Sequence, residues 1–157
     1  MPKRKLIETE LRVKAKERNG VQLHGYLDGL IALEGDGYCV MDIKTTRRPE
    51  YARLNYALQL NCYAYCLENA ADGYPSYPVD QLGILTFTGF RFGVNPPDQG
   101  GIVGKVGYHE VTRDERLVGE AMGKALMILS SDSLPLPIDG CQWCQFYEQF
   151  GVKAESQ

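Results

Sequence analysis

The pattern of hydrophobic and polar positions begins as an alternation. Over residues 5–16, Ile7, Leu11 and Val13 fall on one side of an extended chain, and charged residues fall on the other. This period of two is typical of a half-exposed strand. Two further stretches rich in β-forming residues follow after turn signals, at 21–33 and 38–45. The chain therefore starts with a predicted antiparallel meander of three strands.

Helical spacing replaces the alternation after Pro49. Residues 51–71 contain no internal glycine or proline, which favours a single helix. Six residues are predicted to supply its apolar surface: Leu54, Leu58, Leu60, Cys62, Tyr65 and Leu67. A second helix is predicted over 112–130, where Thr112 and Glu115 fit a capping box. Its core stripe is expected to comprise Leu117, Met122, Leu126 and Leu129.

Two strands are predicted between these helices. The stretch 81–90 is almost continuously apolar, which indicates a buried strand, and 103–111 is expected to lie at an edge. The prolines and glycines of 91–101 predict a flexible excursion between them, either a lid or a long loop. The order β-β-β-α-β-β-α predicts an α/β (α+β) fold, a mixed sheet of about five strands flanked by helices.

Length and composition restrict the class of protein. A chain of 157 residues suits one domain over 1–157, with a core of about 6–132 and a tail over 133–157. The content of 44% hydrophobic and 24% charged residues is that of a soluble globular protein. No apolar run approaches the roughly 20 residues of a membrane span, and the start MPKRK does not lead into a signal-peptide core. We therefore expect a cytoplasmic protein of a bacterial, archaeal or phage-infected cell.

Charge is distributed unevenly along the chain. The formal net charge is −3, but residues 1–60 carry 11 Lys+Arg against 8 Asp+Glu, and residues 61–157 carry 6 against 12. The basic excess thus lies in the half with the three predicted strands. An acidic chain with one basic face can bind a polyanion with modest, salt-sensitive affinity.

Three polar residues converge in the predicted meander. Asp42 and Lys44 are two apart in a strand, so both side chains point to the same face. If the loop at 34–37 has an odd number of residues, Leu33 pairs with Gly37 and Asp28 lies across from Asp42. A two-residue loop would turn Asp28 to the wrong face. We predict the odd loop, or a bulge with the same result.

Two carboxylates about 5 Å apart repel each other unless a cation lies between them. Oxygen ligands with open water positions suit Mg²⁺ or Mn²⁺ better than zinc. Lys44 beside the metal would orient or help deprotonate an attacking water and neutralise charge on a phosphate. Gln59 and Tyr63, one helical turn apart, share a face; the Gln suits a phosphate or base, and the Tyr can stack or hold Lys44. Four residues are predicted to contact a nucleic-acid backbone: Thr46, Arg47, Arg48 and Arg53.

In these features the chain resembles the PD-(D/E)XK nuclease superfamily, whose fold is restriction-endonuclease-like. Three segments carry the resemblance, GYLDG at 25–29, YCVMDIKT at 38–45 and QLNCY at 59–63, and it extends over roughly 6–150. They are most similar to the RecB-like branch, including the exonucleases of CRISPR adaptation and their phage relatives. The resemblance implies Asp28, Asp42 and the carbonyl of Ile43 as ligands of Mg²⁺ or Mn²⁺. It also implies Lys44 as catalytic and Gln59 with Tyr63 as a supporting motif.

The function implied is metal-dependent hydrolysis of DNA, as an exonuclease or end-processing enzyme in repair, recombination or phage and CRISPR-type DNA processing. The alternative is a catalytically weak or inactive DNA-binding or scaffold module of a larger nuclease complex. DNA is the expected partner and a membrane is not. A homo-oligomer or a larger nuclease or helicase assembly is compatible with either function.

Members of this branch usually carry a His or Glu ligand in a helical region ahead of the first strand, and the chain begins almost at that strand. We expect this ligand to be missing or replaced. Glu8 and Glu10, on the polar face of the first strand, and His24, on the same side as Asp28, are the candidates. The alternatives are exposed strand carboxylates and a strand-end histidine satisfied by hydrogen bonds.

The five cysteines do not suggest a disulfide framework. Many relatives end in a Cys-x-x-Cys-x5-Cys run that contributes to a [4Fe–4S] cluster. Here Cys141 and Cys144 keep the first pair but Phe150 stands at the third place, so no iron–sulfur cluster is expected. We predict a vestige in an irregular aromatic tail, packed by Trp143, Phe146, Tyr147 and Phe150. Three other cysteines are predicted to be small core residues: Cys39, Cys62 and Cys66.

Overall fold

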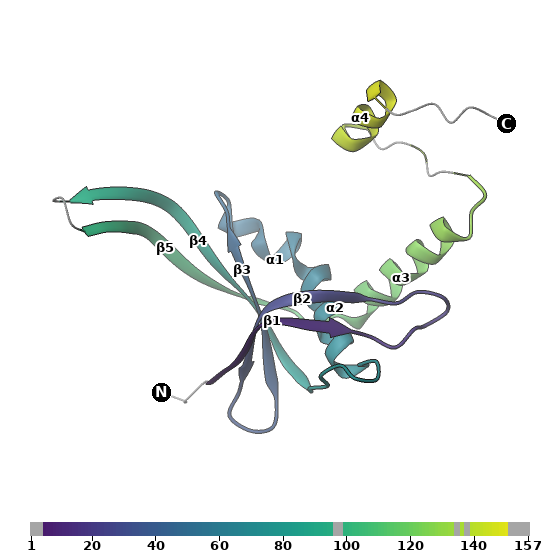
Figure 1. Ribbon diagram of the computed structural model, residues 1–157, viewed down its shortest axis with the longest axis horizontal. Coiled ribbons are helices and arrows are strands. Elements are labelled where there is room, and N and C mark those ends of the chain that lie inside the picture. Colours follow the sequence, from purple (N-terminus) through teal and green to yellow (C-terminus); the bar gives the residue numbers. More distant parts are fainter. Residues whose placement is uncertain (1–4, 96–98, 134–135, 137–138, 151–157) are drawn as a thin grey trace.

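A mixed five-stranded sheet runs through the protein in the strand order β1-β2-β3-β4-β5 (Figure 1). The structure, a computed structural model, describes residues 5–95, 99–133, 136 and 139–150. Strands β3 and β4 pair in parallel, and the other neighbours pair antiparallel. The predicted element order and the mixed α+β sheet are confirmed. The strands are β1 (Lys5–Lys14), β2 (His24–Ala32), β3 (Tyr38–Thr45), β4 (Val79–Asn95) and β5 (Gln99–Val111).

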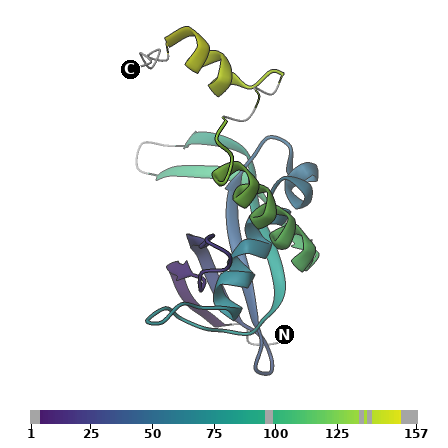
Figure 2. The ribbon, with the colours of Figure 1, turned by 90° about the vertical axis from the view of Figure 1, so that its right-hand side faces the viewer.

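Helices occupy the crossover that the parallel pair requires, because parallel strands cannot be joined by a tight hairpin. The crossover from β3 to β4 contains a 3₁₀ turn (Pro49–Tyr51), α1 (Ala52–Asn55) and α2 (Ala57–Glu68). Helix α2 lies against β1 to β4, and α3 (Glu115–Leu129) packs on α2 (Figures 1 and 2). Helix α4 (Gln142–Phe150) lies apart from the sheet (Figure 1). Among the described residues, no helix is long and apolar enough to cross a membrane.

The core lies between α2 and the sheet. Leu60 and Leu67 of α2 are fully buried, as are Val40 of β3 and Leu82 and Ile84 of β4. Burial of each such side chain contributes about 1.5–3 kcal/mol. Because strand side chains alternate, every second residue of β3 from Val40 onward points to the same side as this core. The residues at positions 42 and 44 therefore face α2.

Strand β2 twists strongly halfway along its length. Leu27 and Leu30 are both fully buried although they are three positions apart, which a flat strand does not allow. Glu10, which lies across from Asp28 between the paired residues of β1 and β2, has a φ of 52°. This left-handed conformation is rare for a residue other than glycine. The twist places Asp28 where β2 turns toward β3.

The helix predicted over 51–71 is broken in two. Tyr56, with φ −114° and ψ 5°, interrupts the helical backbone between α1 and α2. The break lets α1 contact β4 and β5 while α2 runs across the rest of the sheet. Leu54 and Leu58, predicted to belong to the apolar surface, are 78% and 43% exposed. The prediction of one continuous helix is therefore wrong, whereas the predicted burial of Leu60 and Leu67 is confirmed.

The flexible excursion predicted over 91–101 is mostly strand. Pairing of β4 with β5 continues from Arg91 and Val103 to Asn95 and Gln99, and residues 96–98 lie outside the described part of the chain. The ladder shifts register after Thr88, where Gly89 has a φ of +66°. A glycine of this conformation is typical of a β-bulge. The glycines of this segment thus serve a bulged two-stranded ribbon, and β5 lies at the sheet edge as predicted.

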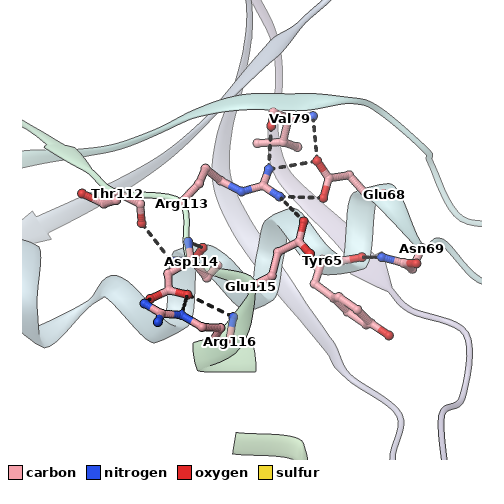
Figure 3. Close-up of polar contacts among 10 residues, drawn as sticks. Tyr65, Glu68, Asn69, Val79, Thr112, Arg113, Asp114, Glu115 and Arg116 are labelled. Atoms are coloured by element: carbon pink, nitrogen blue, oxygen red, sulfur yellow. Dashed lines mark hydrogen bonds and ion pairs between the residues drawn. The ribbon is translucent and has the colours of Figure 1, made fainter. Parts of the chain in front are cut away.

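The second long helix begins later than predicted. Asp114 is the N-cap of α3, and its carboxylate accepts a hydrogen bond of 3.1 Å from the backbone N–H of Arg116 (Figure 3). The predicted capping box of Thr112 and Glu115 is wrong, because Asp114 occupies the cap position directly before the helix. The predicted core stripe is also too long: Met122 is buried but Leu129 is 73% exposed.

The tail contains a helix where an irregular segment was predicted. Helix α4 begins directly after Cys141, and the backbone N–H of Cys144 donates a hydrogen bond of 3.4 Å to the Cys141 sulfur. Trp143, Phe146 and Tyr147 are 81%, 56% and 61% exposed, so most of their ring surface faces solvent, and their packing on the cysteines stays a prediction. The predicted contribution of Phe150 lies outside the described side chains. The rings of Trp143 and Phe146 contact each other edge to face, with centroids 6.3 Å apart.

Candidate active site

The hairpin between β2 and β3 has the predicted odd register. Gly29 pairs with Met41, and the backbone N–H of Leu33 donates a hydrogen bond of 3.0 Å to the Gly37 carbonyl. Continuing this register by one pair brings Asp28 across from Asp42. The backbone thus places the two predicted ligands side by side on neighbouring strands.

Asp42 is a buried carboxylate without hydrogen bonds. It is 1% exposed, and neither of its side-chain oxygens has a hydrogen-bond partner in the described part of the chain. Lys44 Nζ lies 2.5 Å from Asp42 Oδ2, which makes a close ion pair although the geometry is not that of a hydrogen bond. Burial raises the pKa of Asp42, and Lys44 offsets only part of this effect. Burial alone would lower the pKa of Lys44, but the Asp42 carboxylate raises it overall.

Asp28 joins the two strands through its side chain. Its Oδ2 accepts a hydrogen bond of 2.7 Å from the backbone N–H of Ile43, the residue between Asp42 and Lys44. The bond fixes the half-buried Asp28 carboxylate beside β3 through its Oδ2. The Ile43 carbonyl remains a predicted ligand.

Helix α2 presents the two residues predicted as its supporting motif. Gln59 Nε2 donates a hydrogen bond of 2.8 Å to the Tyr63 hydroxyl, so both side chains are held together on one face. The Tyr63 ring lies over β2 at Gly25, where an added Cβ would come within 2.8 Å of Cε1. A glycine is therefore required at this contact for the ring to reach β2.

The sequence reasoning missed Tyr56. The Lys44 ammonium lies 5.0 Å from the centroid of the Tyr56 ring, within cation–π range. Tyr56 stands three residues before Gln59 and seven before Tyr63, so all three share a helical face. Extending the spacing of Gln59 and Tyr63 back by one turn would have identified it.

A polar pair on β4 and β5, of which Thr86 is fully buried and His109 partly buried, was also missed. Thr86 is fully buried and lies beside Lys44 in the parallel ladder. Its hydroxyl lies 3.3 Å from the Gly107 carbonyl oxygen and 3.0 Å from Nε2 of His109. The hydroxyl can donate to either the Gly107 carbonyl or His109 Nε2, so the direction of the His109 bond depends on the tautomer of its ring. The isolated Thr and His gave no signal in the sequence.

The three candidates for a further ligand are not gathered at the site. Glu8, Glu10 and His24 are exposed. No group of three or more His, Cys, Asp or Glu side chains in the described part of the chain is close enough to hold a metal ion. The register does place Glu10 across from Asp28 on the backbone, at the residue with the positive φ. Its role as a ligand stays a prediction.

Three of the four predicted nucleic-acid contacts lie together. Thr46, Arg47 and Arg48 line a shallow open depression after β3, together with Tyr51 and Asn55. The Thr46 hydroxyl accepts a hydrogen bond of 3.1 Å from the Arg48 backbone N–H, which shapes the turn. The fourth predicted contact, Arg53, is exposed but does not line this depression.

Comparison with known proteins identifies the family. The family model of the PD-(D/E)XK nuclease superfamily matches residues 1–149, almost the whole chain. The protein belongs to this superfamily. Its members are nucleases that generally use divalent metals and act on DNA. No curated protein matches the sequence.

A solved structure titled "Crystal structure of SSO0001" has a similar fold. The TM-score is 0.53 with 18% sequence identity, over 90% of this chain. The chain spans 58% of the length of that solved protein. At this identity the likeness supports the fold and carries nothing about substrate or partners.

The residues at the site fit a divalent metal ion. The fit rests on two neighbouring carboxylates: the buried Asp42, whose only cationic contact among the described residues is Lys44, and Asp28 on the adjacent strand. Lys44 balances one of the two negative charges, and a second cation would balance the other. Hard carboxylate oxygens favour Mg²⁺ or Mn²⁺ over softer metals.

Proposed function

We propose that the protein is a Mg²⁺- or Mn²⁺-dependent deoxyribonuclease that acts as an exonuclease or end-processing enzyme. The observation that carries this proposal is the buried Asp42 carboxylate, which is paired with Lys44 but completed by no further donor from the described residues. A structural ion pair is usually completed by hydrogen bonds, whereas this one leaves carboxylate oxygens open. DNA repair, recombination and phage or CRISPR-type processing are the settings in which a RecB-like enzyme of this kind would work.

Asp28, Asp42 and the Ile43 carbonyl would hold the metal ion. When bound, such an ion activates a water molecule and neutralises charge on the phosphate. Among the protein's own residues, Lys44 would act on the substrate. With Asp42 bound to a metal ion, the Lys44 ammonium would be released from the ion pair with Asp42 and could contact a phosphate oxygen or the attacking water. Tyr56 limits where that ammonium can go, and Gln59 offers its amide oxygen and remaining N–H toward the substrate.

The basic residues after β3 would bind the DNA backbone. Arg47, Arg48 and Arg53 form no ion pair with any residue that the structure describes, so their charges are available to phosphates. Thr46 shapes the turn that carries two of them. This basic segment directly continues the strand that holds Asp42 and Lys44.

The test is degradation of end-labelled single- and double-stranded DNA with Mg²⁺ or Mn²⁺. Wild type should degrade at least one substrate, and Lys44→Ala and Asp42→Ala should each lower the rate by about 100-fold or more. Arg116→Gln, a change at an exposed arginine at the start of α3 that is paired with Asp114, serves as the matched control. Equal degradation by wild type and both site variants would refute the assignment. Calorimetric titration with Mn²⁺ adds a readout without catalysis: Asp42→Ala should lose binding.

A second candidate function is a DNA-binding or scaffold module without catalysis. The observation that favours it is the lack of a third acidic, His or Cys side chain at the Asp28–Asp42 pair in the described part of the chain. The same assay separates the two, because a module would bind labelled DNA but leave it intact at every metal concentration.

A further inference from the structure

A second group of cations lies on the β1–β2 hairpin, away from the turn after β3. Two cross-strand pairs form it, Arg12 with Tyr26 and Lys14 with His24, and residues directly opposite each other share a face. Tyr74, from the loop after α2, completes the group. We call these five residues the β1–β2 patch: Arg12, Lys14, His24, Tyr26 and Tyr74.

Aromatic rings hold the cations of the patch. The Arg12 guanidinium carbon lies 6.0 Å from the centroid of Tyr26 and 5.6 Å from that of Tyr74. Lys14 Nζ lies 5.9 Å from the centroid of Tyr74. A ring contacts the flat face of a guanidinium and leaves its N–H donors in the plane free. Arg12 is therefore positioned without its hydrogen-bonding capacity being consumed.

Backbone hydrogen bonds fix the ring of Tyr74 at this place. Lys16 N–H donates to the Asn69 carbonyl at 2.8 Å, and Ala71 N–H donates to the Lys14 carbonyl at 2.8 Å. The turn closes with a bond of 3.0 Å from Tyr74 N–H to the Ala71 carbonyl, over a glycine with φ +82° at position 73. The loop after α2 is thus attached to β1, and the arrangement of rings and cations is built in advance of any ligand.

The charge of the patch has no acidic partner in the part of the chain that the structure describes. Neither Arg12 nor Lys14 forms an ion pair with a described residue, and Glu10, two positions before Arg12, forms none with it. By contrast, Arg113 and Arg116 are paired with carboxylates. In a chain with net charge −3, two positioned cations without a carboxylate indicate an anionic ligand.

The patch lies next to the candidate active site along β2. Tyr26 and Asp28 are two residues apart in β2, with the buried Leu27 between them. At about 3.3 Å per residue, the patch extends from about 7 to about 13 Å beyond Asp28. A polyanion that reaches the Asp28–Asp42 pair can therefore continue over these cations, since DNA rises about 3.4 Å per base-pair step.

We propose that the β1–β2 patch binds the phosphate backbone of DNA beyond the scissile position, with Arg12 as its main donor. This proposal rests on the proposed function only for the choice of DNA as the polyanion. Arg12 donates from its planar fork to phosphate oxygens, and Lys14 adds charge. The rings of Tyr26 and Tyr74 keep the guanidinium plane in place, so affinity depends on them although they carry no charge.

The experiment measures binding without cleavage. Anisotropy of a labelled oligonucleotide, as a single strand and as a duplex, is recorded in EDTA over a range of salt concentrations. Arg12→Gln should weaken binding by about three- to tenfold and lower the slope of log affinity against log salt by about one. Tyr74→Leu should weaken binding by about two- to threefold at an unchanged slope. Circular dichroism establishes that each variant is folded.

Arg116→Gln is the matched control, because it removes the same charge from an exposed arginine that is paired with Asp114. It should bind as wild type does. The proposal is overturned if wild type binds neither form of DNA, if Arg12→Gln binds like wild type, or if Arg116→Gln is weakened equally. Failure of the nuclease proposal looks different: binding depends on Arg12, but no DNA is degraded when metal is added.

Discussion

Helix α2 has two polar clusters, one on the side of the active site and one at the start of α3, and they are built in opposite ways. At the second, Asn61 is 2% exposed and makes three hydrogen bonds, to Ala57 and Thr112 carbonyls and from the Asp114 amide. Beside it Glu68 and Arg113 form a two-bond pair at 2.8 and 2.9 Å (Figure 3). At the first cluster, Asp42 is buried equally deeply with open oxygens.

The difference separates stability from function. A fully bonded buried network stabilises one arrangement of the backbone, and here it fixes α2 and α3 at the sheet. An incompletely bonded carboxylate weakens the fold and gains only when a cation arrives. The hydrogen-bonded cluster around Asn61 therefore holds α2 in place, and α2 carries the residues that line the active site beside Asp42.

The largest effect is expected from breaking the hydrogen-bonded cluster around Asn61. Asn61→Leu removes three hydrogen bonds and leaves the Thr112 carbonyl and the Asp114 amide without their partner. We expect a loss of about 2–4 kcal/mol in the free energy of unfolding, measured by urea denaturation. Asn69→Leu, which removes one exposed hydrogen bond from the same helix, should cost about 1 kcal/mol or less. A loss for Asn61→Leu no larger than the control would mean that the cluster does not hold α2.

A smaller effect is expected when the Lys44 contact is loosened at Tyr56. Tyr56→Leu keeps an apolar side chain but removes the ring face, so kcat for DNA hydrolysis should fall by about tenfold with KM unchanged. Tyr56→Phe keeps the ring and should retain most of the activity. Steady-state kinetics on one labelled substrate measures both. Equal losses in the two variants would assign the effect to the hydroxyl or to packing, and not to the cation contact.

The smallest effect is expected in the pH dependence of thermal stability, which tests whether the charge on the buried Asp42 weakens the fold. Because burial raises the pKa of Asp42 above 3.8, the stability it contributes is fully present below pH 3.8 and is lost as pH rises through its folded pKa. Asp42→Asn keeps a neutral side chain and escapes that loss. Its Tm should match wild type near pH 3.8 and exceed it by about 2–4 °C at neutral pH, without metal. A Tm difference that is independent of pH would contradict this reading.

Much of the fold could be predicted from the periodicity of hydrophobic residues and from the residues typical of turns. The hairpin register was predictable because a slip of one residue would turn Leu30 and Val40 away from the core and expose them. The order of strands followed from hydrophobic runs separated by glycine and proline. The family resemblance predicted which side chains meet at the end of β3.

The misses have a common cause in long-range contacts. Leu54 has the spacing of a core residue, but the break at Tyr56 turns α1 toward β4 and β5. No local sequence pattern indicates this break. The glycines of 91–101 signal a loop locally, although pairing between β4 and β5 makes them strand. Thr86 and His109 are 23 positions apart in the sequence and meet only because β5 returns beside β4. Their contact therefore could not be predicted from local spacing.

The contact between Tyr63 and Gly25 carries a consequence for how this chain can vary. Since a side chain at position 25 would overlap the present position of the ring, we expect the residues at the two positions to change together. Replacement of Tyr63 by a small residue would make room for a larger side chain at position 25, whereas with the tyrosine in place such a side chain would displace the ring. Covariation between a strand glycine and a helix tyrosine is therefore a signature by which descendants of this active site can be traced.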